Sequence, residues 1–326
     1  MKSNVLTVLA TIMLVGVPHL SAQAKGADCI ARQYKVIAVP LRPTHINESG
    51  LVSGTTRQHH AGLWSEQKGL RELPLPPGFY NSEAVGVNST GEVVGAVYDR
   101  SFTKHQAFRF RNEKLSLLEG EQSVAHWIND SGEIAGEAII AGKATTGPVL
   151  WTEKATTSLG GCCGGAATGM NNHGQVVGDL YDKAGSYAAF LSDSAHAMMT
   201  IGPPNRYSSA IAINESGHVV IQAFSQAYLY ADGKLAQLDL SRQYPSQPRA
   251  ISDCDVVVGS FGPFADANHA FIWEKSNGFR DLNSLIPSDS SWKLEVATSI
   301  NNRGEIVGVG DHLHEDDTGF LLVPQR

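Results

Sequence analysis

The sequence predicts an all-β fold, a seven-bladed β-propeller built from four-stranded antiparallel blades. A nine-residue motif, seen as INDSGEIAG at 128–136, recurs seven times, with copies beginning at residues 46, 87, 128, 170, 213, 251 and 300. A second motif of small, aromatic and branched residues, seen as HAFIW at 269–273, follows every copy. A sequence period of about 40 to 45 residues is typical of a propeller blade with four strands.

Four β-strands can be assigned within each period, and we name them a to d. Strand a ends in the Ile-Asn of the first motif, strand b is its Val-Val-Gly run, and strand c is the second motif. Strand d is a Leu-rich run such as KLSLLEG at 114–120. Short runs of aromatic and β-branched residues separated by turn signals are typical of strands.

The ring of blades needs a closing strand. The last c strand, at 318–326, is the end of the sequence and has no d strand after it. A run that matches the d pattern, YKVIAVPL at 34–41, precedes the first blade. Because an open ring would expose two sheet edges, we expect residues 34–41 to pair with the last blade and close the propeller.

The first motif contains the chemistry of a tight turn. In six of its copies an Asn precedes a Gly by three positions. An Asn side chain can bond its own backbone two residues on, and Gly adopts positive φ without steric cost, so we expect a short a–b turn. The sixth copy has Ser252-Asp253-Cys254-Asp255 instead, and a distorted turn is expected there. The glycines that end most copies, such as Gly95, are expected where two backbones approach closely.

The first 24 residues are typical of a secretory signal peptide. Lys2 precedes an apolar run from Val5 to Val17, and small residues end at Ala24. The run is shorter than the ~20 residues that span a bilayer. We therefore expect cleavage after Ala24, a secreted or periplasmic location, a lead-in at 25–33 and a single propeller domain at 34–326. The mature chain is expected to be a monomer without a membrane span.

The repeats resemble the HAF-repeat family of probable extracellular bacterial proteins. The family is named for the sequence that stands here as His269-Ala270-Phe271, and the resemblance covers about residues 34–326. It implies secretion and a repeat architecture but no reaction. The departures are the sixth turn, Ile221 in place of a terminal glycine, and Pro148 in the third c strand.

The loops opposite the a–b turns are the expected place for a functional site. The b–c and d–a loops vary in length and composition, and function commonly lies on variable loops held by a rigid scaffold. Aromatic rings beside Arg and carboxylates suit an acidic or neutral glycan, although a single residue of this kind is more often an ordinary solvated loop residue. The candidate ligand-binding residues are Arg57, His59, Asp99, Arg100, His105, Tyr181, Asp182, Arg206, Tyr207, Arg242, Tyr244 and Trp292.

Metal and cofactor sites are not expected. The densest group of metal-ligand residue types matches no known spacing, and its members are His312, His314, Glu315, Asp316 and Asp317. The sequence contains no nucleophile elbow, zinc-binding helix or phosphate loop. Net charge is −7, so nucleic acid is a poor candidate partner.

The four cysteines suit an oxidising compartment. Strand directions place Cys29 on the same face as Cys254, and we predict a disulfide between them. Cys162 and Cys163 lie together on the opposite face and form either a vicinal disulfide or two free thiols.

The sequence thus favours a binding module for a glycan or an extracellular protein. The alternative is a polysaccharide lyase or hydrolase with its site in the central funnel. The sequence excludes neither a hydrolase that uses a pair of carboxylates nor a lyase that uses a His or Tyr base. A structural envelope or matrix protein is a third reading. An enzyme would need acid and base groups that converge at the funnel mouth, whereas a binder can spread its contacts over the face.

Overall fold

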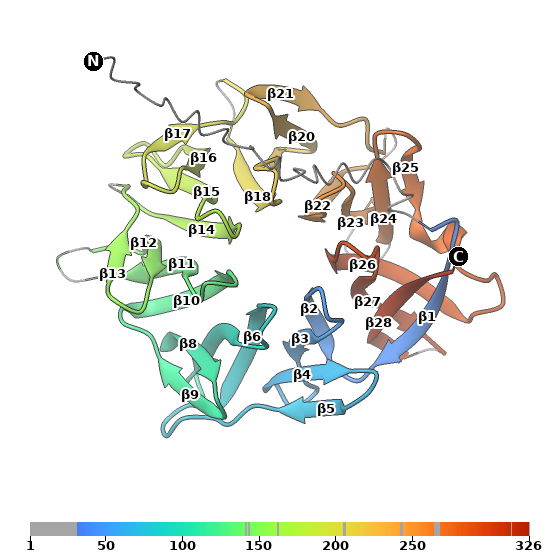
Figure 1. Ribbon diagram of the computed structural model, residues 1–326, viewed down its shortest axis with the longest axis horizontal. Coiled ribbons are helices and arrows are strands. Elements are labelled where there is room, and N and C mark those ends of the chain that lie inside the picture. The colour runs from blue at the N-terminus through green and yellow to red at the C-terminus, as the bar shows by residue number, and fades with distance from the viewer. Residues whose placement is uncertain are drawn as a thin grey trace, which may run out of the picture.

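The computed structural model describes residues 31–326 except 141, 143, 162, 205–206, 242–243, 264–267, 314 and 326, with the backbone alone at 316. Seven four-stranded antiparallel sheets stand in a ring around a central axis (Figure 1). The predicted seven-bladed propeller is therefore confirmed. No helix in this part of the chain is long and apolar enough to cross a membrane.

Each blade runs outward from the axis in the order a to d. The inner a strands are β2 (Arg42–Ile46), β6 (Asn81–Val87), β10 (Glu121–Ile128), β14 (Gly165–Met170), β18 (Ser209–Ile213), β22 (Ser246–Ile251) and β26 (Trp292–Ile300). The b strands are β3 (Val52–Thr55), β7 (Val93–Tyr98), β11 (Ile134–Ile139), β15 (Val176–Tyr181), β19 (Val219–Ala223), β23 (Val257–Phe261) and β27 (Ile306–His312). The c strands are β4 (Ala61–Ser65), β8 (His105–Arg111), β12 (Gly147–Trp151), β16 (Tyr187–Ser192), β20 (Gln226–Ala231), β24 (His269–Glu274) and β28 (Glu315–Gln325). The outer d strands are β5 (Gly69–Glu72), β9 (Lys114–Leu117), β13 (Thr156–Ser158), β17 (Met198–Thr200), β21 (Lys234–Gln237), β25 (Gly278–Asp281) and, in blade 7, β1 (Gln33–Val39).

Strand β1 closes the ring as predicted. It pairs antiparallel with β28, so the first and last described strands share one sheet (Figure 1). Tyr34 is fully buried in the core between blades 6 and 7. The strand ends at Val39, and Leu41, which the sequence placed in the same strand, instead packs in the core between blades 7 and 1.

The hydrophobic cores lie between neighbouring blades. The core between blades 3 and 4, for example, combines Ala135 and Leu150 with Met170 and Phe190. The phenylalanine of the second motif is buried in this way at Phe108, Phe190, Phe271 and Phe320. Blades 1, 3 and 5 have Gly62, Val149 and Tyr228 at this place, so the size of the packed side chain varies from one blade to the next.

The a–b turns define one face of the ring, which we call the turn face; the b–c and d–a loops define the opposite loop face. In each regular turn the Asn Oδ1 accepts backbone N–H bonds, as at Asn47 from Ser49 and Leu51 at 3.0 and 2.9 Å. Gly50, the turn glycine, has a φ of 81°.

The expectation of a distorted sixth turn was wrong. Asp255 N donates to Ser252 O at 3.0 Å, the same bond that Gly50 N makes to Asn47 O. Asp255 adopts the positive φ, 58°, in place of glycine. Ser252 Oγ accepts from Val256 N at 3.3 Å in place of the Asn oxygen. A hydroxyl oxygen that accepts the backbone bond and a residue that tolerates positive φ are thus sufficient to form the turn. Asp is among the non-glycine residues that adopt this conformation most readily.

A β-bulge interrupts every a strand opposite the last residue of the first motif, which lies within the b strand and is a glycine in every blade except the fifth. In blade 2 the register shifts between Ala84 and Gly86, across from Gly95. A Cβ at Gly95 would collide with the backbone oxygen of Glu83, so the expected close approach is real and lies between strands a and b. In blade 5 Ile221 takes this place and the bulge is retained.

Candidate functional site

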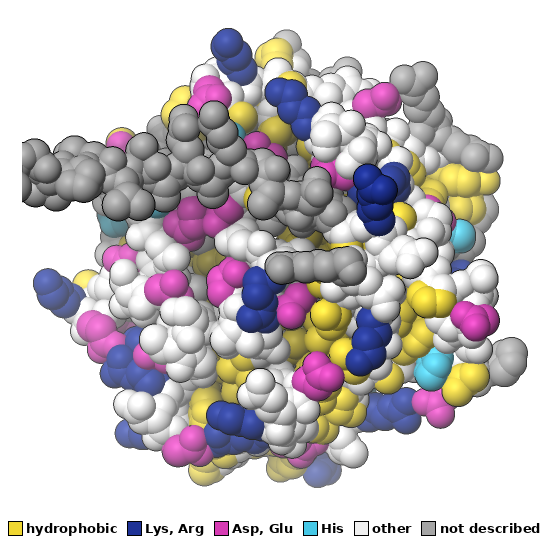
Figure 2. All heavy atoms as spheres, turned by 45° about the vertical axis from the view of Figure 1, so that its right-hand side comes forward, with side chains coloured by type: hydrophobic (Ala, Val, Ile, Leu, Met, Phe, Trp, Pro, Cys, Tyr) yellow, Lys and Arg dark blue, Asp and Glu magenta, His cyan; other side chains and the backbone are white. Residues whose placement is uncertain are grey.

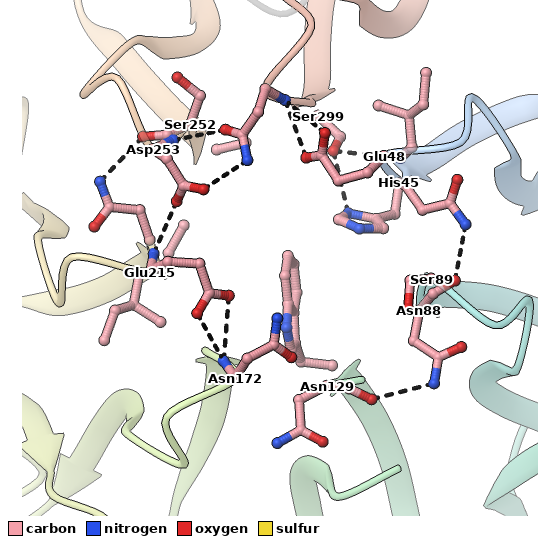
Figure 3. Close-up of a pocket in the computed structure, with 18 of the residues that line it drawn as sticks. His45, Glu48, Asn88, Ser89, Asn129, Asn172, Glu215, Ser252, Asp253 and Ser299 are labelled. Atoms are coloured by element: carbon pink, nitrogen blue, oxygen red, sulfur yellow. Dashed lines mark hydrogen bonds between the residues drawn. The ribbon is translucent and has the colours of Figure 1, made fainter. Parts of the chain in front are cut away.

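The central channel opens on the turn face into a cavity of about 280 Å³ (Figure 3). Its wall is formed by the seven a–b turns, and hydrogen bonds link side chains of one turn to the next. The residue after each repeated Asn, or after Ser252, contributes most of the polar wall: Glu48, Ser89, Asp130, Asn172, Glu215, Asp253 and Asn302.

Two rings of hydrogen bonds join neighbouring turns. In the first, five of the six repeated Asn side chains donate an N–H to the main-chain oxygen of the next turn, as from Asn47 to Asn88 O at 2.8 Å and from Asn301 to Asn47 O at 3.1 Å. This ring is interrupted at Asn129, which donates to Glu133 Oε2 instead, and at Ser252, which has no amide. In the second, the residue after the repeated Asn, or after Ser252, donates its backbone N–H to a side-chain oxygen of the following turn in every blade except the first, as from Asp130 to Asn172 at 2.8 Å. These bonds engage polar groups of the cavity wall in contacts between neighbouring blades, so we assign the turn-face cavity an architectural role.

A pair of rings narrows the channel beyond the turns. His45 of β2 meets Trp127 of β10 edge to face, with centroids 4.6 Å apart. Ser299 lies beside His45, with Oγ 3.1 Å from Nδ1. Burial lowers the pKa of His45 from 6.5 to about 4, so the ring is neutral at physiological pH.

The loop-face mouth of the channel is a cavity of about 600 Å³ that is lined by both polar and apolar side chains. The lining includes Thr44, Arg249 and Thr298, which occupy the bulges of their a strands. Bulges re-aim side chains, and here they bring polar groups to the channel. His59 and Glu83 complete the polar rim.

Charged and polar side chains of blades 2 to 5 form what we call the mouth group, of which Glu83 lines the mouth cavity: Glu83, Tyr98, His126, Glu137, Asp179 and Ser209. Tyr98 Oη donates to Glu83 at 3.1 Å, and His126 Nε2 lies 3.7 Å from Glu137 Oε1. Ser209 Oγ donates to Asp179 at 2.8 Å.

Burial and like charge shift two of these groups. Burial raises the pKa of Asp179 above its usual range, and the negative charge of Glu137 adds to the effect. Burial, together with Glu83, raises the pKa of Tyr98. Asp179 therefore keeps its proton to higher pH than an exposed carboxyl, as a general acid would.

The loop face has a second hollow, of about 670 Å³, at the junction of blades 1 and 7. It arises because β1 joins β2 through residues 40 and 41 alone, whereas residues 73–80 and 282–291 fill the equivalent connections after β5 and β25. We call it the junction pocket.

Several predicted residues converge on the junction pocket from opposite ends of the sequence. Arg57 pairs with Glu315 at 2.8 Å, and Asp317 pairs with Arg42 at 2.6 Å. His59 and His312 also line the pocket, and the predicted Trp292 stacks on His312 with centroids 4.4 Å apart. Both ion pairs are exposed, and such pairs contribute little to stability.

A second set of predicted residues gathers on blade 2. Asp99, Arg100 and His105 lie in or beside the β7–β8 loop, where the His105 ring packs 5.8 Å from Tyr98. Asp99 braces this loop, since its carboxylate accepts from Thr103 N and Lys104 N at 2.9 and 3.1 Å.

A third set lies on blades 4 and 5. The predicted Tyr181 and Tyr207 belong to a row of rings that also contains Tyr187 and Phe224, with successive centroids 5.5, 5.2 and 5.8 Å apart. Asp182 is a loop brace like Asp99, accepting from Ala184 N and Ser186 N. The nine candidates named so far therefore lie in three separate groups on the loop face.

The other predicted residues are quickly placed. Tyr244 lies in the connection between β21 and β22. Arg206, Arg242, His314, Cys29 and Cys162 lie outside the described residues, and so does the side chain of Asp316. The disulfide pairings of Cys254 and Cys163 thus stay predictions. Among the described residues, no group of three or more His, Cys, Asp or Glu side chains could hold a metal ion.

The mouth group was missed by sequence reasoning. A signal existed: the position three before the repeated Asn is His126 in blade 3, while the sixth copy has Arg249 three before Ser252, in strands that are otherwise mostly apolar. The bulge that turns these side chains inward cannot be recognised from alternation alone.

Comparisons with known proteins show the fold. No protein-family model and no curated protein matches the sequence. The structure is similar to virginiamycin B lyase from Staphylococcus aureus, with a TM-score of 0.56 and 13% identity over 90% of this chain and 100% of that chain. It is also similar to YCF48 bound to D1 peptide, with a TM-score of 0.55 and 10% identity over 90% and 97% of the two chains.

A third similar structure is acylaminoacyl peptidase from Pyrococcus horikoshii, with a TM-score of 0.52 and 13% identity over 75% of this chain and 44% of that chain. At these identities the likeness establishes the propeller fold alone. The same fold carries a lyase, a peptidase and a protein bound to a peptide, so function must be argued from the site.

Proposed function

We propose that the protein is a secreted binding module whose loop face recognises a glycan or another extracellular macromolecule. The observation that carries this proposal is the position of the exposed aromatic rings. Every exposed aromatic side chain in the described part of the chain lies on the loop face, and they are Tyr80, Phe102, Tyr181, Tyr207 and Phe224. Clustered exposed apolar side chains mark interaction surfaces.

Two of these rings are held by an unfavourable backbone conformation. Phe102 and Phe224 have φ values of 58° and 53°, in a region that costs a bulky residue roughly 1–2 kcal/mol. At the place of Phe102, the equivalent b–c turn of blade 4 has Gly185, with φ of 81°. An exposed ring that replaces the favoured glycine supports a role in binding.

A glycan is the ligand that this surface suits best. The C–H faces of sugars pack on aromatic rings, and the polar loop residues around them supply hydrogen bonds. Figure 2 shows one side of the molecule, on which acidic and basic side chains are interspersed with exposed hydrophobic ones and form no large field of one sign. The signal peptide and the resemblance to HAF repeats support a location outside the cytoplasm, where glycans are available to a monomeric binder.

A polysaccharide lyase or hydrolase is the second candidate. The mouth group supports it, because Asp179 has a raised pKa and His126 with Glu137 lies nearby in the same group. A buried acid with a raised pKa beside a potential base is typical of a catalytic site.

One experiment separates the two candidates. The mature protein from Lys25 onward is mixed with a panel of polysaccharides, and melting temperature is followed together with ultraviolet absorbance from unsaturated sugars and with reducing ends. A melting shift without product is expected; it should disappear in Tyr207→Ala/Phe224→Ala or Tyr80→Ala/Phe102→Ala. Leu117→Ala, on the outer strand β9, is the matched control and should keep the shift.

Product formation that Asp179→Asn abolishes would establish the enzyme instead. Absence of both a melting shift and product would reject glycan recognition and leave a protein partner. Secretion is tested separately, by fractionating expressing cells and sequencing the mature N-terminus, which is expected at Lys25.

A further inference from the structure

We infer that blade 2 is a binding site for the carboxylate groups of an acidic polysaccharide. The inference rests on the proposed function, and adds to it the charge of the ligand and the blade that recognises this charge. It depends on the β7–β8 loop, residues 99–104, and on the connection that precedes β6.

Two cations of the β7–β8 loop stand over aromatic rings of the neighbouring connection. The Arg100 guanidinium lies 4.6 Å from the centroid of Tyr80, and the Lys104 ammonium lies 5.7 Å from that of Phe79. Within the described chain neither cation has a carboxylate partner. Their charges are thus available to a ligand, unlike that of Arg57, which pairs with Glu315.

The one acidic residue of the loop is already used. Asp99 accepts hydrogen bonds from the N–H groups of Lys104 and Thr103 and from the hydroxyls of Ser101 and Thr103. These bonds, that from Lys104 first, hold the pKa of Asp99 below its usual range. From blade 3, Gln122 donates to Thr103 O at 3.0 Å. The loop is therefore braced before a ligand arrives, which lowers the entropic cost of binding.

The exposed rings complete the chemistry of a uronic acid. Tyr80 and Phe102 are 50% and 59% exposed, so their surfaces can receive a sugar ring. The planar guanidinium of Arg100 matches a carboxylate in a bidentate pair, and a cation stacked on a ring keeps its outer hydrogen-bond donors.

Charge elsewhere points to the same blade. The chain carries a net charge of −7, so a polyanion is repelled in general and needs a local cationic site. The ring row of blades 4 and 5 stands beside Asp179, whose charge adds to the shift at Tyr181. Blade 2 is therefore the better match for a carboxylate.

The test measures binding of the mature protein to polygalacturonate, to its methyl ester and to dextran sulfate by titration calorimetry. Polygalacturonate is expected to bind, and the ester to bind at least about tenfold more weakly, because a hydrogen bond to a charged group is lost. Arg100→Gln and Lys104→Gln should each weaken binding by about tenfold. Lys114→Gln on β9 removes the same charge from an outer strand of the same blade and should leave affinity unchanged.

Each contrary result has a distinct meaning. Equal binding of the ester overturns the inference but leaves the glycan-binding module. Dextran sulfate binding as tightly as polygalacturonate, with no effect of Arg100→Gln, also overturns it, by showing adsorption of any polyanion. Absence of binding to every glycan in the broader panel refutes both this inference and the glycan part of the proposed function.

Discussion

The hydrogen-bond rings of the turn face make a quantitative prediction at Asn88. This side chain is 3% exposed and accepts from Thr90 N, Thr90 Oγ1 and Glu92 N at 3.2, 2.8 and 2.9 Å. It also donates to Asn129 O at 3.1 Å in the next blade. At about 1 kcal/mol for each bond, Asn88→Ala should lower the free energy of unfolding by about 3 to 4 kcal/mol.

The protein itself supplies the comparison variant. Ser252 occupies the equivalent place in blade 6 and retains one backbone acceptor, for Val256 N, but has no amide to donate. Asn88→Ser should therefore cost about half as much as Asn88→Ala. Ser89→Ala is the matched control, since this side chain makes no interblade bond with any described residue, and a change within about 0.5 kcal/mol is expected.

Urea unfolding followed by fluorescence measures the three variants at constant slope. A loss below about 1 kcal/mol for Asn88→Ala would refute the view that the rings stabilise the propeller. Equal losses for the Ala and Ser variants would show that the local turn acceptor is dispensable and that the interblade amide carries the effect.

Three further predictions concern closure, protonation and packing. Deletion of β1 (residues 33–39) removes the buried Tyr34 and exposes β28, and is expected to abolish cooperative thermal unfolding; an unchanged melting curve would rule out the closure. The folded pKa of His45 is about 4 against an ordinary 6.5, so stability should be full above pH 6.5 and fall by about 3 kcal/mol between pH 6.5 and 4. His45→Gln should flatten that fall in urea titrations across the range. Gly95→Ala brings a Cβ against the oxygen of Glu83 and should cost at least about 3 kcal/mol by the same assay, whereas a neutral result would show that the bulge relaxes freely.

Sequence reasoning recovered the architecture because the repeats encode it locally. The Asn and Gly of six turns, the buried Phe of four c strands and the d-like run at 34–41 each correspond to one structural requirement, and the recurrence over seven copies makes the pattern clear. This reasoning failed at the sixth turn because it inferred the hydrogen bonds of the turn from residue identity. Ser252 and Asp255 form the same turn with a hydroxyl acceptor and a positive φ instead of Asn and Gly.

The site was harder to predict, for two physical reasons. Loop residues were assigned to a face by strand direction, which fixes the face but not which blades meet. Asp99 and Asp182, selected as ligand contacts, brace their own loops. Moreover, a bulge shifts the alternation of a strand by one residue. A strictly alternating pattern therefore does not predict the direction of the His126 and Arg249 side chains, which stand at bulges.

The pairing of β1 with β28 has a consequence for how the protein comes apart. In a linear array of repeats, the terminal units lack one neighbour, fray first and need polar caps. Here blade 7 is sealed by a strand that continues directly into blade 1, so every unit has two neighbours. Slow amide hydrogen exchange should therefore show no gradient from the chain ends to the middle, and the inner strands of all seven blades should become exchangeable together.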